Sequence, residues 1–247
     1  MSDKKIFVIS MPRTASTYLF NVYTDYNSPE QYVLPCKIPK EPFNSRQSKK
    51  SRAEQIDNIC NAKRCVVVSH ANHFEILTEL QKKVLFTDCA THFTLLFRRN
   101  LVDMAMSLIR GRTSDFWHTF KTDKQIEIKP STVTYETINE VIRIVHTTIH
   151  LVTYEFGALY NVSYDNIIFK EDLTYDPKTD WFNSGYCDIP LNKLHIREPI
   201  FMKNPPVKDF LINYDSVYNQ VSDYYRSYEN KNIEIKDGIV KHLFGKT

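Results

Sequence analysis

The stretch S-M-P-R-T-A-S-T at residues 10–17 lies between an apolar run at residues 6–9 and a segment with helical periodicity at residues 18–23. This order predicts a strand, a short loop and the start of a helix. The first turn of a helix offers unpaired backbone N–H groups and the positive end of the helix dipole, which together bind anions. The loop would add one cation and three hydroxyl groups to such a site, from Arg13, Thr14, Ser16 and Thr17.

The first glycine of the chain is Gly111, so neither a Walker A loop nor a G-x-G-x-x-G fingerprint exists near the amino terminus. The loop must hold its anion through Arg13 and hydroxyl groups, where an ATP-binding loop uses glycine backbone and lysine. A P-R-T-A-S-T sequence after a first strand resembles the 5′-phosphosulfate loop of sulfotransferases that use 3′-phosphoadenosine 5′-phosphosulfate (PAPS). The usual form of that loop is P-[KR]-[ST]-G-[ST]-T, and Ala15 takes the position of its glycine.

Length and composition predict a single α/β domain. A chain of 247 residues with 42% hydrophobic content can bury a sizeable core. Apolar runs at residues 6–9, 65–68, 94–97 and 164–169 alternate with helical patterns, which favours a parallel sheet with helices on both faces. The expected helices span residues 17–26, 51–61, 74–81, 101–111, 133–160 and 216–228. The resemblance implies the same class, a three-layer P-loop-like sulfotransferase fold.

The net charge indicates which class of ligand to expect, and the cysteine content indicates the cellular compartment. The net charge of +3 suits a small anionic ligand and falls short of the concentrated positive field of a nucleic-acid binder. Five cysteines without a C-x-x-C pair are interpreted as reduced thiols of a cytoplasmic protein. Neither a signal-like segment nor 18 consecutive apolar residues are present, so we expect neither secretion nor membrane spanning. The basic, proline-containing residues 37–52 indicate either a solvated loop or a lid over an anion.

A second strand-to-helix junction, L-L-F-R-R-N-L-V-D-M-A-M-S, occupies residues 95–107. Asn100 is the expected N-cap of the helix, and Arg99 at the end of the strand can bind a phosphate with two parallel hydrogen bonds. The stretch resembles the sulfotransferase 3′-phosphate motif R-[DN]-P-x-D-x-x-x-S, with Leu101 at the proline position.

This resemblance implies that Arg99 and Ser107 hold the 3′-phosphate of the nucleotide. The arginines that could assist them are Arg98, Arg110 and Arg112. An ordinary strand-to-helix turn with surface arginines is the alternative interpretation of the same residues.

The run C-V-V-V-S-H at residues 65–70 predicts a buried strand that ends on His70. Ligands of open α/β folds bind at the carboxyl ends of such strands. In many sulfotransferases the matching strand ends in K-T-H, and the resemblance implies that His70 is the general base for the acceptor hydroxyl. Val68 stands at the lysine position, so Arg13 is our candidate to neutralise charge on the leaving oxygen. A hydrogen-bonded structural role is the alternative for His70, and His73 is its local competitor.

Three further patterns have weaker implications. The stretch I-I-F-K-E-D-L-T-Y-D-P at residues 167–177 is similar to the family pattern Y-E-D-L-x-x-D-P, with Lys170 at the tyrosine position. The stretch F-M-K-N at residues 201–204 is a faint counterpart of the family's carboxyl-terminal nucleotide clamp and implies Lys203 as a contact. His146 and His150 share a helix face, but without a third ligand we interpret them as ordinary helix residues.

The motifs occur in the order found in the family and imply a PAPS-dependent sulfotransferase. Such an enzyme moves a sulfuryl group from PAPS to a hydroxyl or amine of a small-molecule or glycan acceptor, with cationic side chains in place of a metal. Two alternatives remain open, a sulfotransferase-like nucleotide-binding module without turnover and a P-loop small-molecule kinase, whose lysine–glycine loop is missing here. Residues 27–60 and 111–135 would select the acceptor.

Overall fold

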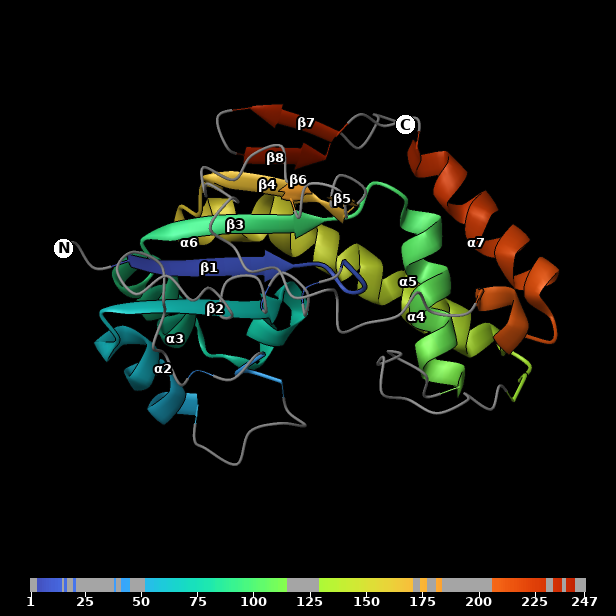
Figure 1. Cartoon of the computed structure of the whole chain (residues 1–247), viewed down its shortest axis with the longest axis horizontal. Coiled ribbons are helices and arrows are strands. Elements are labelled where there is room, and N and C mark those ends of the chain that lie inside the picture. Colours follow the sequence, from blue (N-terminus) through green and yellow to red (C-terminus); the bar gives the residue numbers. More distant parts are fainter. Residues whose placement is uncertain are drawn as a thin grey trace.

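The computed structural model describes residues 4–14, 16, 20, 38, 41–44, 52–114, 129–170, 174–176, 181–183, 206–229, 233–236 and 239–242. At its centre lies a four-stranded parallel sheet in the order β2-β1-β3-β4 (Figure 1). The strands are β1 (Lys4–Ser10), β2 (Arg64–His70), β3 (His92–Phe97) and β4 (Asn166–Phe169). Each coincides with one of the four apolar runs, so the predicted strands and the α/β class are confirmed.

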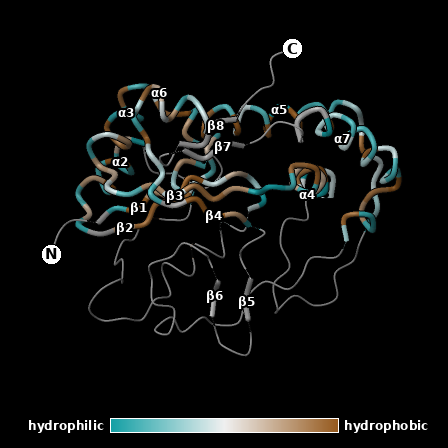
Figure 2. Tube along the Cα trace, turned by 90° about the horizontal axis from the view of Figure 1, so that it is seen from above, coloured by the Kyte–Doolittle hydropathy of each residue, from teal (hydrophilic) through white to brown (hydrophobic). Residues whose placement is uncertain are grey.

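Alternation along the strands divides their side chains between the two faces of the sheet. The main core receives Phe7, Ile9, Cys65, Val67, Leu95 and Phe97. A smaller cluster on the opposite face contains Val8, Val66, Val68, Leu96 and Ile168, and the half-buried Phe20 packs against it. Helices α3 (Glu79–Lys83), α5 (Tyr135–His150) and α6 (Phe156–Tyr160) lie together on one side of the sheet (Figure 2).

Most of the expected helices are confirmed. Helices α2 (Arg52–Asn61), α4 (Leu101–Ser114) and α7 (Tyr214–Glu229) match their predictions within three residues at either end. The long predicted helix at residues 133–160 is a continuous helical stretch, in which a π-helical turn (Leu151–Glu155) joins α5 to α6. The Thr134 side chain accepts a hydrogen bond from the Thr137 N–H and starts it, and Asn161 ends it in the left-handed conformation. The expected helix at residues 17–26 lies outside the described residues except for Phe20.

The predicted helix at residues 74–81 is wrong in its bounds. The structure has a 3₁₀ helix over Ala71–Ile76, a break, and then α3 followed by a π-helical turn (Val84–Cys89). Thr78 makes the break because its side chain accepts from the Gln81 N–H while the Gln81 side chain accepts from the Thr78 N–H. This capping box starts a new helix where apolar periodicity alone suggested a continuous one.

The interpretation of all five cysteines as reduced thiols is also wrong. Cys60 at the end of α2 and Cys89 at the end of the π-helical turn form a disulfide. The two residues are 29 positions apart, and the fold brings their Cα atoms to 5.1 Å. The disulfide lies near the amino-terminal ends of β2 and β3, where Lys5 Nζ donates to the Cys60 carbonyl. Because two of the cysteines form a disulfide, the cysteines no longer support a reducing compartment.

The remaining described elements are short. Two antiparallel hairpins pair β5 (Thr174–Asp176) with β6 (Trp181–Asn183) and β7 (Ile233–Lys236) with β8 (Ile239–His242). A 3₁₀ turn over Val207–Phe210 precedes α7. Among the described helices, none has both the length and the apolarity to cross a bilayer.

Candidate anion-binding site

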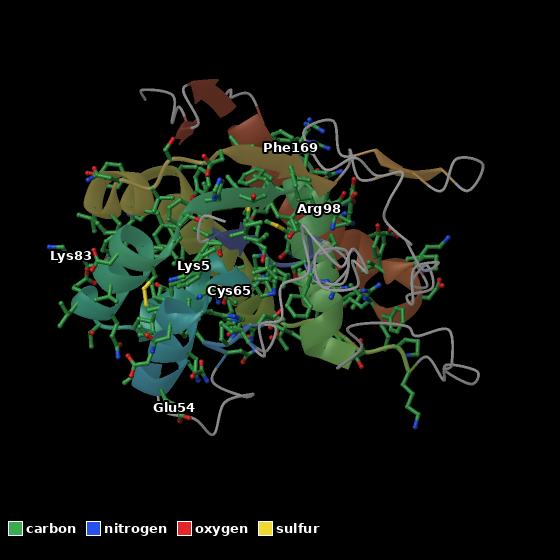
Figure 3. The ribbon with its side chains drawn as sticks, turned by 60° about the vertical axis from the view of Figure 1, so that its left-hand side comes forward. Lys5, Glu54, Cys65, Lys83, Arg98 and Phe169 are labelled. Atoms are coloured by element: carbon green, nitrogen blue, oxygen red, sulfur yellow. A yellow bond between two sulfur atoms is a disulfide. The ribbon has the colours of Figure 1, made fainter. Side chains whose placement is uncertain are left out.

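The candidate site lies at the carboxyl edge of the sheet. Ser10, the last residue of β1, is in register with His70 at the end of β2 and with Leu96 of β3. Helix α4 begins just beyond the end of β3 (Figure 1). Arg98 follows β3, Phe169 ends the neighbouring β4, and the two lie near each other in Figure 3. Parallel strands present their ligand sites at this edge.

The loop after β1 is fixed by its own hydrogen bonds. The Met11 N–H donates to the Leu96 carbonyl at 3.0 Å, and Thr14 Oγ1 donates to the Met11 carbonyl at 2.7 Å. Arg13 has a φ of 61°, which is uncommon for a residue with a Cβ and is typical of strained functional loops. Thr14 and Ser16 are buried, whereas Ala15 and Thr17 lie outside the described residues. The Thr14 hydroxyl therefore donates its proton within the loop in this structure.

Arg13 connects the loop to α4. Its Nε donates to the Ser107 Oγ at 2.8 Å. Arg98 Nη1 donates to the Arg13 carbonyl at 3.4 Å, and Arg98 Nη2 lies 3.3 Å from the Asp103 carboxylate. Two segments that the sequence predicted as separate anion-binding elements thus meet at one place.

Three guanidinium groups gather there. Burial, together with the positive charges of Arg110 and Arg98, lowers the pKa of Arg13 to about 10. Arg110 is buried, which lowers its own pKa, and its guanidinium carbon lies 5.6 Å from the centre of the Phe210 ring. Like charges held together away from water are stabilised by a bound anion. The cluster Arg13, Arg98 and Arg110 is therefore a candidate anion site.

Arg99 and Asn100 take the positions expected of the second motif. The Asn100 Oδ1 accepts from the Asp103 N–H at 2.9 Å, which confirms Asn100 as the N-cap of α4. The guanidinium of Arg99 is exposed and lies over the ring of Phe169, 3.7 Å from its centre. A cation stacked on an aromatic ring in this way is held in place beside the strand end.

Arg112 occupies a different position from the other arginines. Its Nη1 forms a 2.8 Å ion pair with Glu140 of α5. This ion pair connects α4 to α5. Arg112 therefore does not join the cluster, whereas Arg98 and Arg110, the other two arginines that the resemblance implied, do.

His70 lies beside the loop and contacts polar groups through both ring nitrogens. Its Nδ1 is 2.9 Å from Ser10 Oγ, and its Nε2 forms a 3.4 Å ion-pair contact with Glu41 Oε1. The side chain is 18% exposed, so a ligand can reach the ring. The ring of His73, the competing candidate, lies at 5.1 Å from that of His70 and its Nδ1 is 3.5 Å from Ser69 Oγ.

Glu41 is held rigidly opposite His70. Its N–H donates to the Val68 carbonyl at 2.8 Å, and Asn44 Nδ2 donates to Glu41 Oε2 at 3.2 Å. Like Arg13, Glu41 has a positive φ, 55°. Two left-handed residues with side chains at one sheet edge indicate a backbone shaped for binding or catalysis.

The order Ser10, His70 and Glu41 has the connectivity of a serine hydrolase triad, but the geometry does not support that chemistry. Ser10 is fully buried, and its Oγ donates to the Ser69 carbonyl at 3.2 Å. A nucleophile must be open to its substrate and directed toward it. Ser10 is therefore a supporting group.

His146 lies far along α5 and has partners of its own. Its Nε2 is 2.7 Å from the Tyr224 hydroxyl, and its ring stacks on Tyr225 at 6.4 Å. Within the part of the chain that the structure describes, no three His, Cys, Asp or Glu side chains are grouped as metal ligands would be.

Two residues of the site escaped the sequence interpretation. One feature of the sequence could have drawn attention to Glu41: it is the only acidic residue in the basic stretch at residues 37–52. Ser10 stood at the start of the quoted loop but had no assigned role. Lys203, expected as a nucleotide contact, lies outside the described residues.

Comparison with known proteins gives no match, whether with protein-family models, with curated proteins or with solved structures. The function must therefore be argued from the residues of this site.

Proposed function

We propose that the protein is a PAPS-dependent sulfotransferase. It would transfer the sulfuryl group of PAPS to a hydroxyl or amine of a small-molecule or glycan acceptor and release adenosine 3′,5′-bisphosphate. The observation that supports this most is the 2.8 Å hydrogen bond from Arg13 to Ser107, because it joins the loop proposed for the 5′-phosphosulfate to the helix proposed for the 3′-phosphate.

The charges of the site suit a ligand with two separate anionic groups. Arg98 and Arg110 are buried, Arg13 is half-buried, and the exposed Arg99 follows β3. In the proposed arrangement Arg13 holds the 5′-phosphosulfate, with Thr14 and Ser16 beside it. Arg99 and Ser107 hold the 3′-phosphate through charge-assisted hydrogen bonds. Ala15, Thr17 and Lys203 keep their proposed contacts with the nucleotide, on the resemblance alone.

The proposed reaction is an in-line transfer. The acceptor hydroxyl gives its proton to His70 while its oxygen forms a bond to sulfur. The bond between sulfur and the 5′-phosphate oxygen breaks, and its electron pair stays on that oxygen. Arg13 neutralises the charge that develops there, as a preorganised cation does in other group transfers.

A radiolabel assay tests this function. The protein is incubated with PAPS labelled in the sulfuryl group and with sugars, phenols, amines and peptides, and transfer of label is followed. We expect transfer to at least one acceptor by the wild-type protein. His70→Ala should abolish transfer and retain affinity for adenosine 3′,5′-bisphosphate; an equally active His70→Ala variant would remove His70 as the base.

A nucleotide-binding module without turnover is the second candidate. One observation favours it, namely that Ser10 and Glu41 contact both ring nitrogens of His70, so a base would have to exchange a protein contact for the acceptor. Tight bisphosphate binding with no transfer to any acceptor would select the binding module. Measurable transfer would reject it.

A further inference from the structure

The hydroxyl of Ser10 lies between two groups of β2. It is 3.2 Å from the Ser69 carbonyl, to which it donates, and 2.9 Å from the Nδ1 of His70. A serine hydroxyl has one proton and two lone pairs, and a carbonyl can only accept. Once the proton of Ser10 is directed to Ser69, the contact with His70 requires that Nδ1–H donates to the oxygen of Ser10.

This arrangement is shielded from water. Ser10 and Ser69 are both fully buried at the junction of β1 and β2. A buried donor or acceptor without its partner costs about 1–3 kcal/mol, so a buried site of this kind favours one proton arrangement strongly.

We propose that Ser10 is a positioning residue that keeps the proton of His70 on Nδ1 and so makes Nε2 the nitrogen that exchanges a proton during the reaction. The tautomer is a property of the protein itself, whereas the use of Nε2 in catalysis rests on the proposed sulfuryl transfer.

Glu41 faces Nε2, and in the neutral Nδ1–H form its carboxylate meets a bare nitrogen, so the hydrogen bond between Nδ1–H and Ser10 must outweigh that contact. Glu41 Oε1 lies 3.4 Å from Nε2, and the neighbouring His73 ring stands edge-on at 5.1 Å. A carboxylate at that distance favours the imidazolium, so Glu41 stabilises the charge that His70 gains when Nε2 accepts the acceptor's proton. After the sulfuryl transfer, Nε2 returns that proton to solvent and Nδ1–H stays on Ser10.

Nitrogen NMR of histidine-labelled protein tests the proposal without any need for activity. Above the pH at which His70 loses its charge, the wild-type ring should show a protonated Nδ1 and a bare Nε2. Ser10→Ala should move the remaining proton wholly or partly to Nε2, where Glu41 accepts it. Ser10→Thr keeps the hydroxyl and should restore the wild-type pattern.

Ser69→Ala is the matched control. It removes a buried hydroxyl one residue from His70 but leaves the Ser69 backbone carbonyl in place, so the wild-type tautomer should persist. A wild-type ring with its proton on Nε2 would overturn the proposal, as would a Ser10→Ala variant with the unchanged Nδ1–H form.

Kinetics provide the second readout. Ser10→Ala should lower kcat about tenfold or more while the KM for PAPS stays within about twofold, and Ser10→Thr should recover most of the rate. A parallel loss of kcat in Ser69→Ala would point to a general packing defect and count against the proposal. If no variant, wild type included, transfers sulfuryl groups, the proposed function fails while the NMR result still decides the role of Ser10.

Discussion

Arg13 and Ser107 are joined by a 2.8 Å hydrogen bond although 94 positions separate them in the chain. Arg13 belongs to the loop after β1 and Ser107 to the second turn of α4, so the bond unites two strand-to-helix junctions at the carboxyl edge of the sheet. Arg98 strengthens this connection by donating to the Arg13 carbonyl at 3.4 Å. The two junctions therefore form one positively charged site, which suits a ligand with two anionic groups.

Arg99→Ala should weaken the binding of adenosine 3′,5′-bisphosphate about 10- to 150-fold, because a hydrogen bond to a charged group contributes about 1.5–3 kcal/mol. Isothermal titration calorimetry measures the change. Arg112→Ala is the matched control, since Arg112 pairs with Glu140 and should leave the affinity within about twofold. Equal losses in the two variants, or none in Arg99→Ala, would contradict the assignment of the 3′-phosphate.

Arg110→Met should lower the affinity for the bisphosphate without lowering the stability of the free protein. Methionine fills similar space beside Phe210 and removes a buried charge that repels Arg13. We expect the free energy of unfolding in urea to stay equal or rise by up to about 2 kcal/mol, and the bisphosphate affinity to fall about tenfold or more. A free protein that becomes clearly less stable would show that Arg110 serves the fold rather than a ligand.

Binding should weaken at alkaline pH. The pKa of Arg13 is lowered to about 10 by burial and by Arg110 and Arg98, so Arg13 is charged below about pH 10 and loses its proton above it. Affinity for the bisphosphate is therefore complete below that pH and falls as the pH rises through it. Titrations between about pH 8.5 and 10.5 suit the test, because the phosphates are already fully ionised there.

The free protein should respond to the same pH change in the opposite direction. The unfolded chain keeps the ordinary, higher pKa of arginine and binds the proton more strongly than the folded chain, so Arg13 contributes rising stability above about pH 10. Arg13→Ala is the control for both effects and should show neither. An affinity of the wild-type protein that parallels Arg13→Ala over this range would contradict the placement of Arg13.

Removal of the Cys60–Cys89 disulfide should lower stability by about 2–4 kcal/mol, measured by chemical unfolding of the double alanine variant. Bisphosphate affinity should stay unchanged, because the disulfide lies near the amino-terminal ends of the strands and the arginines lie at their carboxyl ends. A loss of affinity without a loss of stability would connect the disulfide to the site.

Local patterns were sufficient for most of the regular structure. The apolar runs that became β1 to β4 are continuous, the stretch that became α5 is amphipathic over many residues, and Asn100 has the side chain of an N-cap at the start of α4. The arginines could be placed at the sheet edge because strand ends in a parallel sheet share one edge.

The parts that escaped prediction depend on contacts between distant segments. Cys60 and Cys89 have no spacing that reveals their pairing, and only the packing of α2 against the turn before β3 brings them together. Glu41 reaches His70 from an irregular stretch with no periodicity to place it. Thr78 interrupts a helix through a reciprocal cap that apolar periodicity does not detect.

The proposed specificity for a nucleotide with a 3′-phosphate is tested most directly by calorimetric titration of adenosine 3′,5′-bisphosphate against adenosine 5′-monophosphate, with the wild-type protein and no acceptor. We expect the bisphosphate to bind about 100-fold more tightly or better, since the 3′-phosphate adds contacts with Arg99 and Ser107. Equal affinities, or tighter binding of ATP with Mg²⁺ than of the bisphosphate, would contradict a PAPS site.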